Sequence, residues 1–149
     1  MSSTDASSAE AAASRLHFKG ALRSYADACA LEVIDPRIQA LVAALNVPGV
    51  VYTHSSCQGH RLPPFAARQT PFVMFRCALE LAAKLSARVR AGQMTRDLNL
   101  RHYWVVEAWF LDDDQLVFCL QTSDRRFKRR QLDADFACLT LWAQEVFRA

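Results

Sequence analysis

The spacing of apolar residues along the chain predicts four helices and four strands. Apolar side chains recur every three or four residues, the period of an amphipathic helix, in segments at about 15–33, 36–45, 77–91 and 132–146. Short runs rich in β-branched and aromatic residues predict strands at about 50–53, 71–76, 103–111 and 116–121. The order ααββαββα predicts a single α+β domain over residues 15–149, with helices packed on a mainly antiparallel sheet.

Several boundaries have local signals. Asp35 is suited to cap the exposed amides of a helix whose first position is Pro36. Gly92 is a typical helix end. The acidic stretch 112–114 reads as the turn of a hairpin rather than as a cation site. Trp104 and Trp109 are an odd number of residues apart on one strand, so we expect them to face opposite sides of the sheet.

Composition narrows the class of protein. With 149 residues, of which 52% are hydrophobic, the chain suits one domain with a substantial core. A formal net charge of +3 permits an anionic partner without requiring one. The five cysteines include no paired C-x-x-C spacing, which favours reduced thiols and a cytoplasmic location. Residues 1–14 read as a disordered tail rather than a secretory signal, and no apolar run reaches the roughly 20 residues of a membrane helix.

Residues 51–60, VYTHSSCQGH, carry the densest chemistry in the chain. The polar part begins where a predicted strand ends, so we expect a functional loop there. We expect the long connection at 61–70 to line one side of this site. Hydroxyls and amides around a flexible glycine can bind a carboxylate or phosphate. The candidate catalytic residues are Ser56, Cys57 and His60, and the candidate substrate-binding residues are Thr53, His54, Ser55, Gln58, Gly59 and Arg61.

Three other interpretations of this loop remain open from the sequence. The hydroxyls can simply satisfy the amides of a turn. His54, Cys57 and His60 are zinc-ligand types, with His102 or Cys77 as a distant fourth ligand, although the spacing matches no known signature and we assign no metal site from it. Cys57 can also act as a nucleophile with a histidine base.

A longer stretch, IDPRIQALVAALNVPGVVYTHSSCQGH, is similar to the opening of the wybutosine-synthesising tRNA methyltransferase family. That family has a Thr-Thr-Ser-Ser-Cys-Ser-Gly-Arg loop, and this chain has His54 for the second Thr, Gln58 for the Ser and His60 for the Arg. The form with Gln-Gly-His, followed by Pro-Phe-Val-Met-Phe, also resembles a set of small bacterial proteins. The positions that match the family are Asp35, Asn46, Thr53, Ser55, Ser56, Cys57 and Gly59.

The resemblance implies a small-ligand or nucleotide-binding domain, with S-adenosylmethionine as cofactor and RNA as substrate. A second feature fits RNA: a basic run that contains one aromatic residue, with cations for phosphates and a ring to stack on a base. The alternative for that run is a solvated loop. The alternative for the whole chain is a non-catalytic protein that binds another protein, and whether the chain is an enzyme stays open. The basic run is Arg125, Arg126, Phe127, Lys128, Arg129 and Arg130.

Overall fold

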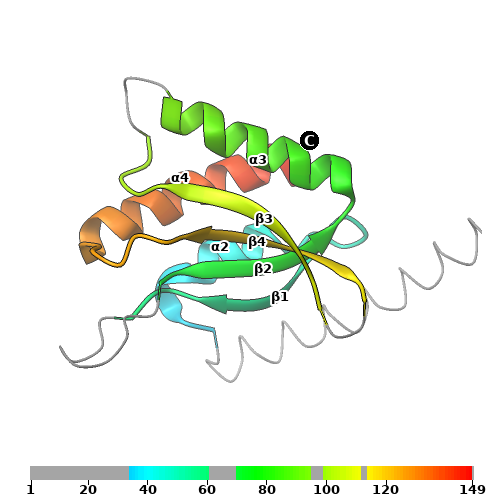
Figure 1. Ribbon diagram of the computed structural model, residues 1–149, viewed down its shortest axis with the longest axis horizontal. Coiled ribbons are helices and arrows are strands. Elements are labelled where there is room, and N and C mark those ends of the chain that lie inside the picture. Colours follow the sequence, from blue (N-terminus) through cyan, green and yellow to red (C-terminus); the bar gives the residue numbers. More distant parts are fainter. Residues whose placement is uncertain (1–33, 61–69, 95–98, 112–113, 149) are drawn as a thin grey trace, which may run out of the picture.

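A computed structural model describes residues 34–60, 70–94, 99–111 and 114–148 (Figure 1). The tail at 1–14 and the helix expected at about 15–33 lie outside these residues. From there on, the predicted order is the observed one. The elements are η1 (Pro36–Ile38), α2 (Gln39–Ala44), β1 (Val51–Cys57), β2 (Phe72–Cys77), α3 (Leu79–Met94), β3 (Trp104–Phe110), β4 (Leu116–Thr122) and α4 (Arg129–Phe147).

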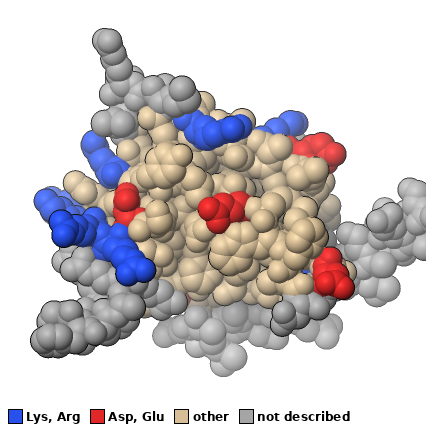
Figure 2. Space-filling view, viewed as in Figure 1, with Lys and Arg blue, Asp and Glu red and all other residues tan. Residues whose placement is uncertain are grey.

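The described strands form one four-stranded antiparallel sheet in the order β1-β2-β4-β3. Helices α2, α3 and α4 pack on it, which confirms the predicted α+β class. In Figure 1, η1, the end of β1 and the start of α4 lie at the same end of the molecule. Lys and Arg side chains gather at this end in Figure 2, and a second group lies along α3.

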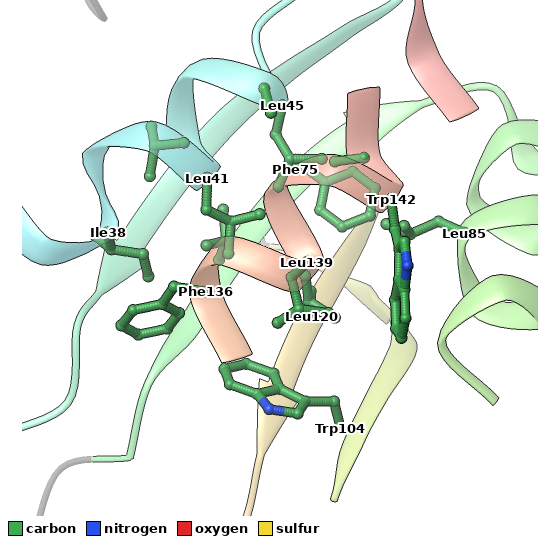
Figure 3. Close-up of a cluster of buried hydrophobic side chains, with 14 of the residues drawn as sticks. Ile38, Leu41, Leu45, Phe75, Leu85, Trp104, Leu120, Phe136, Leu139 and Trp142 are labelled. Carbon is green, nitrogen blue, oxygen red and sulfur yellow. The ribbon is translucent and has the colours of Figure 1, made fainter. Parts of the chain in front are cut away.

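The core lies between one face of the sheet and these helices (Figure 3). Alternate residues of a strand share a face, and Phe118 and Leu120 of β4 both belong to the buried cluster. Each helix contributes a row of apolar residues to the same cluster, including Leu41, Leu85 and Leu139. The apolar periodicity of the sequence therefore identified most of the buried positions of α2, α3 and α4, with Leu79 as an exception because it is 61% exposed.

The β3–β4 hairpin confirms the expected separation of the two tryptophans. Trp104 is fully buried, whereas 44% of the surface of Trp109 is exposed. In the described part of the turn, Asp114 has a φ of 57°, which an aspartate tolerates better than most residues. Asp112 and Asp113 lie outside the described residues.

Gly92 does not end its helix, which corrects the prediction. Helix α3 continues through Gly92 to Met94. A glycine is needed at position 92 because a larger side chain would not fit against α4. A Cβ on Gly92 would lie 2.0 Å from Cη2 of Trp142 on α4. The glycine allows the two helices to approach closely, and Trp142 is also covered by the Arg88 guanidinium, 4.3 Å from the ring centroid.

A fully buried carboxylate on α4 fixes the chain that enters β3. Asp135 accepts backbone hydrogen bonds from Arg101 at 2.6 Å and His102 at 3.0 Å, and one from Nε1 of Trp104 at 3.0 Å. His102 Nδ1 lies 2.7 Å from the same carboxylate, and the His102 side chain is only 4% exposed. A buried carboxylate is stable only when it is surrounded by donors in this way. Both the amide and the side chain of His102 therefore bind Asp135.

We predict that Asp135→Asn lowers the free energy of unfolding by about 3 kcal/mol, because it replaces a buried charged acceptor while its donors remain. Urea denaturation measures this loss. The matched control is Asp133→Asn on the same helix, where the side chain is 37% exposed and a loss below about 1 kcal/mol is expected. Equal losses in both variants would contradict an anchoring role for Asp135.

Candidate functional site

Strand β1 extends to Cys57, four residues beyond the predicted end, so half of the expected loop is strand. The pairing register with β2 shifts between Thr53 and Ser55, which marks a β-bulge at His54. Among the described strands β1 lies at an edge of the sheet, so polar residues in it can face solvent, and His54 and Ser55 are both exposed. Only Gln58, Gly59 and His60 remain as the described loop.

Thr53 has a structural partner. Asn46, at the end of α2, donates from Nδ2 to Thr53 Oγ1 at 2.9 Å and to the Val42 carbonyl at 2.7 Å. The Thr53 amide in turn donates to Asn46 Oδ1 at 3.2 Å. The side chain of Asn46 therefore joins the end of the helix to β1, and the Thr53 hydroxyl is engaged in this link.

Asp35 serves β1 rather than its own helix. Among the described residues its side chain caps no amide of η1, contrary to the prediction. Its Oδ2 accepts a 3.0 Å hydrogen bond from the Gln58 amide and lies 3.2 Å from Nε2 of His60. Arg37 on η1 completes this link, since its amide donates to Oε1 of Gln58 at 3.1 Å. The start of η1 is thereby attached to the end of β1.

Cys57 lies beside this pair. Ligand atoms of Asp35, Cys57 and His60 all lie within 4.8 Å of one another. The Gly59 amide donates to Cys57 Sγ at 3.3 Å. Burial raises the pKa of the Cys57 thiol and Asp35 raises it further, while the Gly59 amide and Arg129 oppose this shift. The sulfur is therefore a neutral thiol at neutral pH, which weakens the nucleophile hypothesis.

Gly59 makes the sharp turn that the sequence suggested. Its φ is +81°, a conformation that side chains rarely adopt. Space is also limited there, because a Cβ would lie 3.0 Å from Cδ of Pro71 and 3.3 Å from Cζ of Phe127. The turn allows Cys57 and His60 to approach the same carboxylate.

The basic run begins α4 and holds the loop. Arg129 donates from its guanidinium to the Gln58 carbonyl at 3.0 Å and to the Gly59 carbonyl at 2.5 Å. Asp133, one turn later, pairs with Arg37. Phe127 is only 2% exposed and belongs to the core cluster, so its ring is not available to stack on a base. The cations of the run that remain exposed are Arg125, Arg126, Lys128 and Arg130.

The structure brings together some of the expected residues and not others. Cys57 and His60 converge, and Asp35 joins them. Ser56 and Cys57 are consecutive in a strand, so their side chains leave on opposite sides. His54 is not part of the cluster, and neither expected fourth ligand, His102 or Cys77, belongs to it. Arg61 and the connection at 61–69 lie outside the described residues.

Three contributors were given another role or none in the sequence analysis, because their partners are distant in sequence. Asp35 is 23 residues from Gln58, and Arg129 is 71 residues from it. No pattern in the sequence indicated a functional role for Asp133. Arg129 stood in the basic run, and Asp35 stood in the segment that resembles the methyltransferase family, so a functional signal existed for these two but pointed to other roles.

Comparisons with known proteins give a fold and no family. No family model matches the chain, and a search of curated proteins finds no match. Among solved structures, the chain is similar to the PH1069 protein from Pyrococcus horikoshii, with a TM-score of 0.59 and 14% sequence identity. The similarity covers 83% of this chain and 90% of that one. At this identity it shows a shared fold alone. In the part of the chain that is described, no helix is both long enough and apolar enough to cross a membrane.

We predict that Gly59→Ala costs about 1–3 kcal/mol of stability, because a side chain at this φ is strained and Pro71 and Phe127 leave little room. Gly49 supplies a matched control. Its φ is +75°, but nothing lies within 4 Å of an added Cβ, so Gly49→Ala should show the backbone strain alone. Urea denaturation of both variants separates the two effects. Equal costs would mean that the tight packing around Gly59 contributes nothing.

Proposed function

We propose that this chain is a domain that binds a small nucleotide-type ligand at the end of β1. The β1-end site comprises Asp35, Cys57, Gln58, Gly59, His60 and Arg129. The supporting observation is convergence: the starts of η1 and α4 both bind the loop between them through side chains and backbone. An ordinary turn satisfies its own amides and carbonyls and needs no such distant partners.

Charge around the site favours an anionic group on the ligand. Arg37 and Arg129 flank the loop and share Asp133 as an ion-pair partner, so the positive charge comes mainly from the exposed cations of the basic run at the start of α4. The N-terminus of this long helix adds a partial positive charge. Figure 2 shows the concentration of Lys and Arg at this end. A phosphate or carboxylate is the ligand group that such an environment stabilises.

The resemblance to the wybutosine methyltransferases makes the proposal more specific. The Ser-Ser-Cys-x-Gly positions of that family correspond to residues at the end of β1. The family's aspartate corresponds to Asp35, which contacts this strand end by accepting a hydrogen bond from the Gln58 amide. On this basis the ligand is S-adenosylmethionine or its demethylated product, and RNA is the larger substrate. His60 in place of an arginine removes a guanidinium fork, so affinity for the carboxylate of that cofactor should be low.

A second candidate function rests on a different surface. Strand β3 lies at an edge of the described sheet and exposes Trp109 by 44% and Phe110 by 75%. Large exposed apolar residues on an edge strand are typical of protein-binding surfaces. A domain that uses this edge to bind another protein needs no ligand at the β1-end site. Failure of the nucleotide tests below would favour this role.

We predict weak binding of S-adenosylmethionine by the wild-type protein and roughly tenfold tighter binding by His60→Arg, because arginine can form paired hydrogen bonds with a carboxylate. Titration calorimetry with the cofactor, its demethylated product and a nucleoside monophosphate measures this. His54→Arg adds the same charge at an exposed position of β1 and should change nothing. If none of these ligands binds to either protein, the proposed function is wrong.

We also predict that neutralising the exposed cations of the basic run weakens binding of single-stranded RNA. The triple variant Arg126→Gln, Lys128→Gln, Arg130→Gln should reduce the slope of log affinity against log salt by about 2, since each phosphate contact contributes about 0.7. Fluorescence anisotropy with a labelled oligonucleotide measures the slope. A control triple with Lys84, Arg90 and Arg148 changed to Gln removes the same charge elsewhere. Equal slopes in the two triples would show that net charge alone matters.

A further inference from the structure

We propose that Asp35, Cys57 and His60 form a site for a divalent transition metal ion, with zinc as the best match. This site goes beyond the proposed nucleotide binding and does not depend on it. The sequence offered His54, Cys57 and His60 as metal-ligand types. In the structure His54 is exposed on the bulge of β1, and the third ligand is instead the carboxylate of Asp35, just before η1.

The separations of the ligand atoms suit a tetrahedral ion. Zinc binds nitrogen and oxygen at about 2.0–2.1 Å and sulfur at about 2.3 Å, so tetrahedral N and O ligands lie about 3.3 Å apart and sulfur about 3.6 Å from either. His60 Nε2 and Asp35 Oδ2 are 3.2 Å apart. All three ligand atoms lie within 4.8 Å of one another, so closing on an ion requires the sulfur to shift by about 1.2 Å at most.

The donor set determines which metal is suitable. A thiolate, an imidazole and a carboxylate form a mixed set that suits zinc and its neighbours in the first transition row. Calcium and magnesium prefer oxygen ligands and would leave the sulfur of Cys57 unused. On binding, the ion forms a bond to Cys57 Sγ and the thiol proton is released to solvent.

Hydrogen bonds behind the ligands hold them in position. The Gln58 amide orients Asp35, and the Gly59 amide donates to Cys57 Sγ, as expected for a sulfur that carries negative charge in the metal complex. Arg129 fixes the loop by binding the carbonyls of Gln58 and Gly59. A ligand set supported in this way loses little conformational entropy when an ion binds.

The site has a side open to solvent. The His60 side chain is 41% exposed and that of Asp35 is 30% exposed, whereas Cys57 is buried. Three protein ligands with an accessible fourth position are the arrangement of catalytic rather than structural zinc sites, and the fourth position takes water or substrate. An anionic ligand at the β1-end site would be attracted by the same ion.

Titration of the metal-free full-length protein with Co²⁺ tests the site directly. We expect one ion per chain, visible bands typical of tetrahedral cobalt, and a near-ultraviolet charge-transfer band that reports the bond to sulfur; Zn²⁺ should displace the cobalt. Cys57→Ser should abolish the charge-transfer band. Asp35→Asn and His60→Gln should each weaken Co²⁺ affinity by at least about 100-fold.

Matched controls distinguish this site from adventitious binding. His54→Gln removes a histidine from the same strand, and Cys77→Ser removes a thiol outside the cluster, so both should retain the wild-type cobalt spectrum. Zn²⁺ should raise the melting temperature of the wild-type protein and of both controls but not that of Cys57→Ser. Absence of a cobalt spectrum, its persistence in Cys57→Ser, or its loss in either control would overturn the proposal. In that case the Asp35–His60 contact is a simple hydrogen bond.

Discussion

The buried carboxylate of Asp135 is the constraint on which both the core and the β1-end site depend. It fixes the second turn of α4 to the chain entering β3, through backbone amides and the Trp104 indole. Because α4 is a rigid helix, this anchor also fixes its first turn, which lies about 9 Å away along the axis. Arg129 is carried by that turn, so the clamp on the loop after β1 is set by an interaction inside the core.

The site, in turn, is built from polar groups that each connect two elements. Asp35 joins η1 to β1, Asn46 joins α2 to β1, and Arg129 joins α4 to the same strand end. A residue larger than Gly59 would be strained, because φ is positive there and the neighbouring atoms are close. The cost of ordering this loop is offset by charge-assisted hydrogen bonds of about 1.5–3 kcal/mol each. A ligand that moves the loop must therefore also disturb η1 and α4.

The fold was predictable because helix and strand periods are local properties of the sequence, and the order of elements from residue 36 onward was correct. The errors share one physical cause, which is a partner distant in the chain. Gly92 reads locally as a helix end, but the ring of Trp142 sets its role. Asp35 reads as a cap, but Gln58 and His60 take its carboxylate. Phe127 reads as a surface ring in a basic run, but its side chain is buried in the core. Cys57 and His60 were found as candidates because they lie three residues apart.

The histidine at position 60 changes what the β1 end can bind. In the methyltransferase family that the loop resembles, an arginine stands at this position, and a guanidinium beside Asp35 would form an ion pair and offer no lone pair to a metal. An imidazole at the same place offers a nitrogen ligand next to a carboxylate and a thiol. Under the metal proposal the same three positions favour a cation, and under the proposed function the basic run favours an anion nearby. Both preferences are satisfied together when a metal ion holds the anionic group of a ligand, which is how metal-assisted phosphate chemistry is commonly arranged.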